Sequence, residues 1–185
     1  MSTDSADAHA WVERHLVGWP AATRKLAAEL VAKYGRPRGT TGHELIWGAS
    51  GPWTRMVLYR VGVKHNFPRP HEDVLEQAVN YRVPVEKIAD LITYNGSLIV
   101  DRTRGELAAH CDSEAQNTIA INIADDIVTG NRTVDEGLAY HAQLVRAMET
   151  HVAESYPEKL KFKIRSSAQT ADPGSEAQLL RHLGQ

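Results

Sequence analysis

Three side chains capable of acid–base or metal chemistry occur within one short stretch of the sequence: His65, His71 and Asp73. Histidine titrates near neutral pH, and two imidazoles with a carboxylate form either a general base with its orienting group or the ligands of a divalent metal ion. Pro68 and Pro70 lie between the two histidines and restrict the backbone there. We therefore predict a stiff loop that presents the three side chains as catalytic or metal-ligating groups.

A second interpretation of the same stretch involves no chemistry. Its spacing matches no diagnostic zinc motif such as H-E-x-x-H. Pro70 and the acidic Glu72 and Asp73 are also typical of the first turn of a helix, where carboxylates complement the helix dipole. On this interpretation a helix runs over residues 72–81, and His65 is an exposed loop residue.

Two amides are expected inside the helix that the sequence predicts over residues 113–129. Asp112-Ser113 with Gln116 resembles a capping arrangement, and Gly130 ends the helix. A helical wheel places apolar residues around about two-thirds of the circumference, with Gln116 and Asn117 among them. Because buried amides need hydrogen-bond partners, these two either tie the helix to a neighbouring strand or bind a substrate.

Trp53 and Arg55 are further candidates for substrate binding. Aromatic side chains near a predicted hairpin would line an apolar pocket in which Arg55 holds a carboxylate or phosphate. The alternative is that the aromatic residues are ordinary core. Cys111 is the only cysteine, which excludes an internal disulfide and a multi-cysteine zinc site and fits a reducing compartment. It is either a reactive thiolate at a helix start or a small buried hydrophobe.

The order of predicted elements indicates an α+β fold, with antiparallel hairpins packed against several helices and a central apolar helix near 113–129. The regular alternation of strand and helix that a doubly wound sheet needs is absent. The predicted helices cover residues 19–34, 72–81, 85–94, 113–129 and 133–154, and the predicted hairpins pair 45–47 with 53–63 and 97–101 with 106–111. Residues 159–164 alternate lysine with apolar side chains, which favours an edge strand over an extended arm.

Length and composition favour a single domain at residues 11–165, with a mobile N-terminus at 1–10 and a mobile or loosely docked tail at 166–185. The chain has 185 residues, a formal net charge of -2 and a pI of about 6.5, so we expect no nucleic-acid partner. The first residues show no basic start followed by an apolar core, and no apolar run is long enough for a bilayer. We therefore expect no leader, no membrane partner and a cytoplasmic location. G-x-G-x-x-G and P-loop motifs are absent, which argues against a nucleotide cofactor.

Five phrases of the sequence are distinctive: Lys33-Tyr34-Gly35-Arg36-Pro37, Gly51-Pro52-Trp53, His65-Asn66-Phe67-Pro68-Arg69-Pro70-His71, Gly105-Glu106-Leu107 and Asn117-Thr118-Ile119-Ala120-Ile121-Asn122-Ile123-Ala124. Over about residues 11–145 they resemble a family of uncharacterised bacterial proteins. The resemblance implies a bacterial protein and carries over no activity, cofactor or catalytic residue.

Our leading hypothesis is a small soluble enzyme that acts on a low-molecular-weight substrate, through acid–base chemistry of His65, His71 and Asp73 or through a divalent metal bound to them. It requires the proline-containing loop to lie over the start of the central helix, so that His71 and Asn117 face one cavity. The alternative is a noncatalytic module that binds a small molecule or a protein. A homodimer in which residues 159–164 extend the neighbour's sheet is a third hypothesis.

Overall fold

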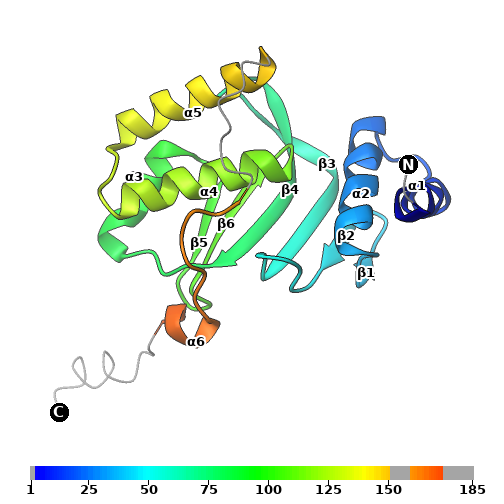
Figure 1. Ribbon diagram of the computed structural model, residues 1–185, viewed down its shortest axis with the longest axis horizontal. Coiled ribbons are helices and arrows are strands. Elements are labelled where there is room, and N and C mark those ends of the chain that lie inside the picture. The colour runs from blue at the N-terminus through cyan, green and yellow to red at the C-terminus, as the bar shows by residue number, and fades with distance from the viewer. Residues whose placement is uncertain (1–2, 151–158, 173–185) are drawn as a thin grey trace.

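A single sheet and the helices on one of its faces form two layers in the computed structural model of the chain, which describes residues 3–150 and 159–172 (Figure 1). Within these residues the sheet has six antiparallel strands in the order β1-β2-β3-β4-β6-β5. The strands are β1 (Gly39–Thr40), β2 (Glu44–Trp47), β3 (Arg55–His65), β4 (His71–Asn80), β5 (Leu98–Asp101) and β6 (Glu106–Cys111). The helices are α1 (Thr3–His15), α2 (Ala21–Tyr34), a 3-10 turn η1 (Val85–Lys87), α3 (Ile88–Tyr94), α4 (Glu114–Val128), α5 (Val134–Glu149) and α6 (Ser167–Thr170). The predicted α+β class with antiparallel hairpins is confirmed.

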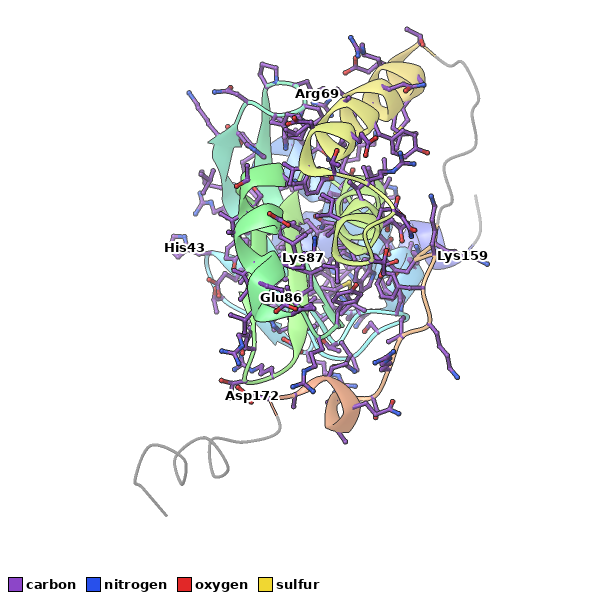
Figure 2. The ribbon with its side chains drawn as sticks, turned by 90° about the vertical axis from the view of Figure 1, so that its left-hand side faces the viewer. His43, Arg69, Glu86, Lys87, Lys159 and Asp172 are labelled. Atoms are coloured by element: carbon purple, nitrogen blue, oxygen red, sulfur yellow. The ribbon has the colours of Figure 1, made fainter. Side chains whose placement is uncertain are left out.

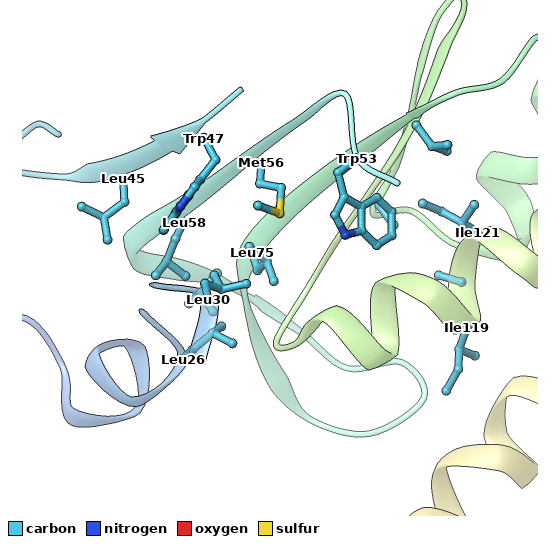
Figure 3. Close-up of a cluster of buried hydrophobic side chains, with 14 of the residues drawn as sticks. Leu26, Leu30, Leu45, Trp47, Trp53, Met56, Leu58, Leu75, Ile119 and Ile121 are labelled. Atoms are coloured by element: carbon cyan, nitrogen blue, oxygen red, sulfur yellow. The ribbon is translucent and has the colours of Figure 1, made fainter. Parts of the chain in front are cut away.

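The core lies between the sheet and the helices that cover it. Leu45, Leu58 and Leu75 lie side by side on β2, β3 and β4 and are fully buried. Leu26 and Leu30 of α2 pack against this row (Figure 3). Because complete burial of one such side chain contributes about 1.5–3 kcal/mol, this row of leucines holds α2 firmly on the sheet.

Helix α4 covers the same face of the sheet farther along, against β4 and β6. Ser113 caps its start by accepting a hydrogen bond from the backbone N–H of Gln116, and Ile119, Ile121 and Ile123 are buried. Helices α3 and α5 pack on α4 in turn. The predicted central apolar helix is therefore confirmed.

Residues 72–80 form most of strand β4, although the sequence favoured a helix over residues 72–81. All residues from 73 to 79 are buried, because the helices cover one face of β4 while Arg55 and Tyr59 of β3 reach over the other to Glu76. A strand buried on both faces lacks an alternating pattern, so the local sequence did not distinguish it from a helix. Pairing with β3 and β6 determines the outcome.

The two ends of the described chain bear on two further predictions. Helix α1 begins at Thr3 and buries Ala8, within the residues 1–10 that are predicted to be mobile. Residues 159–164 form no strand but an extended arm that is fastened to α4. Asn122 donates from Nδ2 to the Lys159 carbonyl (3.1 Å) and accepts at Oδ1 from the Lys161 N–H (2.8 Å). The predicted edge strand is wrong, and the homodimer hypothesis has lost the strand on which it depended.

Two further predictions concern residues outside the described ranges: the end of the helix expected to reach residue 154, and the tail beyond residue 172. Among the helices of residues 3–150 and 159–172, none combines the length and the apolar character that crossing a membrane requires.

Candidate metal centre

The β3–β4 hairpin brings the two predicted histidines together. His65 ends β3, His71 begins β4, and the two residues are cross-strand partners whose ring centroids lie 5.0 Å apart. Asp73 follows His71 by two residues and lies on the same side of β4, because side chains alternate along a strand. The loop predicted to hold His71 and Asp73 is therefore shorter than expected and covers only residues 66–70. His65 and His71 are thus neighbours across the two strands, His71 and Asp73 are neighbours along β4, and all three side chains lie close together.

A bulge in β3 sets this register, and a glycine permits the bulge. The pairing of β3 with β4 shifts between Leu58 and Val63, after which Val63 lies opposite Asp73. Gly62 lies in the shifted segment, where an added Cβ would come within 2.6 Å of the Asp73 carbonyl oxygen. Close backbone approach of this kind is typical of glycine at a bulge. The position of Asp73 therefore depends on a residue that has no side chain.

The hydrogen bonds of His71 define its protonation. Its Nδ1 lies 2.7 Å from the backbone carbonyl oxygen of Arg69. Because a carbonyl oxygen only accepts hydrogen bonds, Nδ1 carries the hydrogen. The other nitrogen, Nε2, faces Asp73 Oδ1 at 2.9 Å and the Cys111 Sγ at 3.2 Å. In neutral His71, Nε2 carries a lone pair that faces a carboxylate oxygen. Two lone pairs repel each other, so the contact requires either a proton on one of the two atoms or a cation between them.

The carboxylate of Asp73 is buried and only half satisfied. Its Oδ2 accepts a hydrogen bond from the Ser97 hydroxyl and lies 3.3 Å from His65 Nδ1. Its Oδ1 has no hydrogen-bond partner among the described residues, although His71 Nε2 is so near. A hydrogen on that ring nitrogen would not point at Oδ1, so an ordinary ion pair does not account for the contact.

The three side chains fit a divalent transition metal. One donor atom each from His65, His71 and Asp73 lie within 4.8 Å of one another. Zn–N distances of about 2.0 Å and tetrahedral angles bring bound donors to about 3.3 Å from each other, so no pair of donors needs to approach by more than about 1.5 Å. The side chains of His71 and Asp73 are each 4% exposed and that of His65 is 21% exposed. A bound ion would therefore be reached from the side of His65.

A third histidine lies behind the hairpin. His141 of α5 is buried, packs edge-on against Phe67 at 5.3 Å, and shares a hydrogen bond of 2.9 Å between its Nδ1 and the Tyr94 hydroxyl. Burial lowers the pKa of His141 to about 4, and the neighbouring imidazoles of His71 and His65 contribute to the decrease. Its Nε2 is buried without a hydrogen-bond partner in the described chain. His141 is therefore uncharged at physiological pH and lies beside the site as a buried neutral side chain.

Arg69 fastens the hairpin turn to the helices. Its guanidinium donates to Asp112 before α4 and lies 3.2 Å from Glu149 at the end of α5. The turn accordingly lies over the start of the central helix, as the leading hypothesis required. Arg69 marks this end of the molecule in Figure 2, and Asp172 marks the opposite end.

The two amides of α4 are buried as predicted, but they do not form a cavity with His71. Asn117 donates from Nδ2 to the Leu75 carbonyl (2.9 Å) and to Gln77 Oε1 (3.0 Å), which ties α4 to β4. Gln116 lines a crevice with His71, and that crevice is too narrow to admit water. Asn117 therefore ties the helix to a neighbouring strand, which was the alternative to substrate binding. Gln116 lies near the site, but no open space connects the two.

Trp53 and Arg55 lie away from the histidines. The Trp53 indole is buried and donates to Glu114 Oε1 (2.7 Å) beside a separate pocket. Arg55 pairs with Glu76 and Glu106. Because Glu76 alternates with its neighbours along β4, this network lies on the sheet face opposite the helices. The structure therefore does not bring either predicted substrate contact to the site.

Cys111 is a buried neighbour of the site. Burial raises the pKa of its thiol to about 12, and the negative charge of Asp112 contributes to the rise. The thiol is therefore protonated at neutral pH and able to donate weakly to His71 Nε2. These features agree with a small buried hydrophobe and not with an activated thiolate.

Comparison with known proteins finds no matching family model, no similar curated protein and no similar solved structure. The resemblance to a bacterial family stays a prediction. The geometry and chemistry of the site are therefore the basis for a functional proposal.

Proposed function

We propose that the protein is a small metal-dependent enzyme in which His65, His71 and Asp73 hold a divalent transition metal ion that acts on a low-molecular-weight substrate. The observation that carries this proposal is the buried contact at 2.9 Å between His71 Nε2 and Asp73 Oδ1, in which Oδ1 has no hydrogen-bond partner among the described residues. In the neutral tautomer with the hydrogen on Nδ1, both atoms are acceptors. A metal ion satisfies both atoms at once, because each offers it a lone pair.

The number of ligands favours catalysis over a structural role. Structural zinc sites have four protein ligands, whereas catalytic sites have three and leave a position for water or substrate. Two imidazoles with one carboxylate are also the ligand set of non-haem Fe²⁺ enzymes. A zinc-bound water has a pKa of about 7 and is a nucleophile at neutral pH. Since His65 is the most exposed of the three ligands, the substrate would enter beside it and be small.

Metal analysis of the purified chain tests the site directly. We expect about one Zn²⁺ or Fe²⁺ per chain after reconstitution and removal of excess metal, and almost none in His65→Ala or His71→Ala. His43→Ala is the matched control, because His43 is exposed and lies far from the hairpin turn (Figure 2). Equal metal content in the wild type and both ligand variants would overturn the proposal.

A further variant tests the geometry without removing a ligand. Gly62→Ala keeps all three side chains but pushes a methyl group against the Asp73 backbone, so we expect weaker metal binding. For the enzymatic part, hydrolysis of the small ester p-nitrophenyl acetate should fall when the metal is chelated and recover when it is returned. Metal bound without any chelator-sensitive reaction on small esters or other small electrophiles would support a noncatalytic metal site instead.

A second candidate function, binding of an apolar small molecule, is favoured by the pocket beside Trp53. This pocket has a volume of about 790 Å³ and is lined by Trp53, Tyr34 and the arm residues Leu160 and Phe162. The size suits a drug-sized ligand. Quenching of tryptophan fluorescence by 8-anilinonaphthalene-1-sulfonate, lost in Trp53→Phe and kept in His71→Ala, would support this function independently of the metal.

A further inference from the structure

Two adjoining cavities lie at the end of the molecule opposite the histidines. Their volumes are about 370 Å³ and 390 Å³, and Tyr81, Arg82, Arg165 and Thr170 line both of them. Arg82 follows β4, whereas Arg165 follows the arm, so the cleft joins segments that are far apart in the sequence. Neither cavity includes any residue of the proposed metal centre.

The C-terminal segment builds one wall of the cleft. Helix α6 rests on the turn between β5 and β6 at Gly105, where an added Cβ would lie 2.0 Å from the Thr170 carbonyl carbon. The Asp172 N–H donates to the Arg102 carbonyl at 3.0 Å, and the two side chains form an ion pair at 3.3 Å. Gly105 also has a φ of +66°, a conformation that favours glycine. Docking of residues 166–172 therefore requires this glycine.

The acidic side chains of the cleft are already engaged. Asp101 pairs with Arg104 at 3.0 Å, Asp172 pairs with Arg102, and Asp125 accepts a hydrogen bond from the Tyr81 hydroxyl at 2.7 Å. Glu86 is the remaining carboxylate of the lining, and it is exposed.

The two arginines that line both cavities have no such partner. Arg82 and Arg165 form no ion pair with any residue of the described ranges 3–150 and 159–172. Among the described lining residues outside ion pairs, Arg82, Arg165 and Lys163 carry three positive charges, and Glu86 and Asp125 carry two negative charges. The balance of one positive charge favours an anion.

Apolar and aromatic side chains form another part of the lining. Val83, Pro84 and Val100 line the first cavity, and Phe162 lines the second, where its ring packs edge-on against Tyr81 at 5.0 Å. A ligand of matching chemistry carries a charged group and an apolar or aromatic body. Guanidinium groups bind phosphate oxygens through paired N–H donors. Two guanidinium groups match the two negative charges of a phosphate monoester better than they match the single charge of a carboxylate ligand.

We propose that this cleft is a binding site for a small organic phosphate monoester, in which Arg82 and Arg165 hold the phosphate and the apolar wall holds the organic group. The site forms only when residues 166–172 dock at Gly105. Binding here is independent of the metal centre, because the two sites share no residue.

Isothermal titration calorimetry with phenyl phosphate tests the proposal on the full-length protein. We expect saturable binding that weakens at least about tenfold in Arg82→Ala and in Arg165→Ala, and that is only partly restored by lysine at either position. Arg146→Ala is the control, because Arg146 is an exposed arginine that lines neither cavity. Inorganic phosphate should bind more weakly than phenyl phosphate, and phenol should not bind.

Two further variants separate the possible failures. Gly105→Ala should weaken binding although both arginines remain, whereas His71→Ala should leave it unchanged. Both arginines are exposed, so their variants should keep the wild-type circular dichroism spectrum. Absence of saturable binding to the wild type, or equal affinity in the wild type and the double variant Arg82→Ala/Arg165→Ala, would overturn the proposal.

Discussion

Replacement of Asp73 by asparagine distinguishes a metal site from an ion pair between Asp73 and His71. The substitution keeps the volume of the side chain and removes its charge. An oxygen of the new amide would still accept from Ser97, and its N–H group would donate to the His71 Nε2 lone pair, which now faces Oδ1 at 2.9 Å. If His71 is neutral and a metal normally lies here, the metal-free variant should be as stable as the metal-free wild type.

The magnitudes make the two interpretations easy to separate. A metal present at about one hundred times its Kd stabilises the folded state by about 2.7 kcal/mol. For a chain of this size each kcal/mol changes Tm by about 2–4 °C, so Zn²⁺ should raise the wild-type Tm by about 5–11 °C and leave Asp73→Asn unchanged. If the contact were a buried ion pair instead, removing one partner would cost about 3–5 kcal/mol and lower the metal-free Tm by about 6–20 °C.

The assay is thermal unfolding of both proteins after chelation and again after addition of Zn²⁺ or Fe²⁺. We expect a metal-induced rise in Tm for the wild type alone and similar metal-free values of Tm. A variant that keeps the full metal-induced rise would refute the assignment of Asp73 as a ligand. A large loss of metal-free stability, with no metal effect on either protein, would establish the ion pair.

Three further predictions concern residues around the site and the arm. For His141, the folded pKa of about 4 lies below the ordinary value of 6.5, so the unfolded chain binds the proton first as pH falls. At 1.36 kcal/mol per pKa unit, chelated wild-type protein should lose about 3 kcal/mol of unfolding free energy between pH 6.5 and pH 4 in denaturant titrations, and His141→Gln should lose less. Cys111, with its pKa raised to about 12, should react with Ellman's reagent at pH 8 far more slowly in native than in unfolded protein; equal rates would contradict its burial. Asn122→Ala removes two hydrogen bonds to the arm and should cost about 1–3 kcal/mol, with faster hydrogen exchange at the Lys161 amide; unchanged exchange would mean that other contacts hold the arm.

The sequence indicated which of these residues come together better than it indicated the element that carries them. His65, His71 and Asp73 were recognised from residue type and proximity, yet His71 and Asp73 lie on a strand and not in a loop. Because β4 is buried on both faces, its residues give no period of two. Strand pairing and the bulge at Gly62 determine the hairpin between β3 and β4. Neither can be predicted from the secondary-structure propensities of the residues.

The residues that surround the site could not be predicted from local sequence patterns. Ser97 reaches it from the turn before β5 and His141 from α5, and a single sequence holds no signal for such long-range contacts. One clue was present: His141 falls in the apolar stripe of α5 with Leu138, Leu144 and Val145, where a polar residue needs a partner. The central helix, by contrast, was predictable, because its capping residues and its apolar surface are encoded locally.

The placement of all three proposed ligands on the β3–β4 hairpin bears on the order in which the protein folds. His65 and Asp73 are separated by a short turn, so bringing them together closes only a small loop and costs little chain entropy. A hairpin with such local contacts forms within microseconds, whereas α5 must travel from far along the chain to cover it. A metal ion would therefore find its three ligands assembled before His141 of α5 covers them.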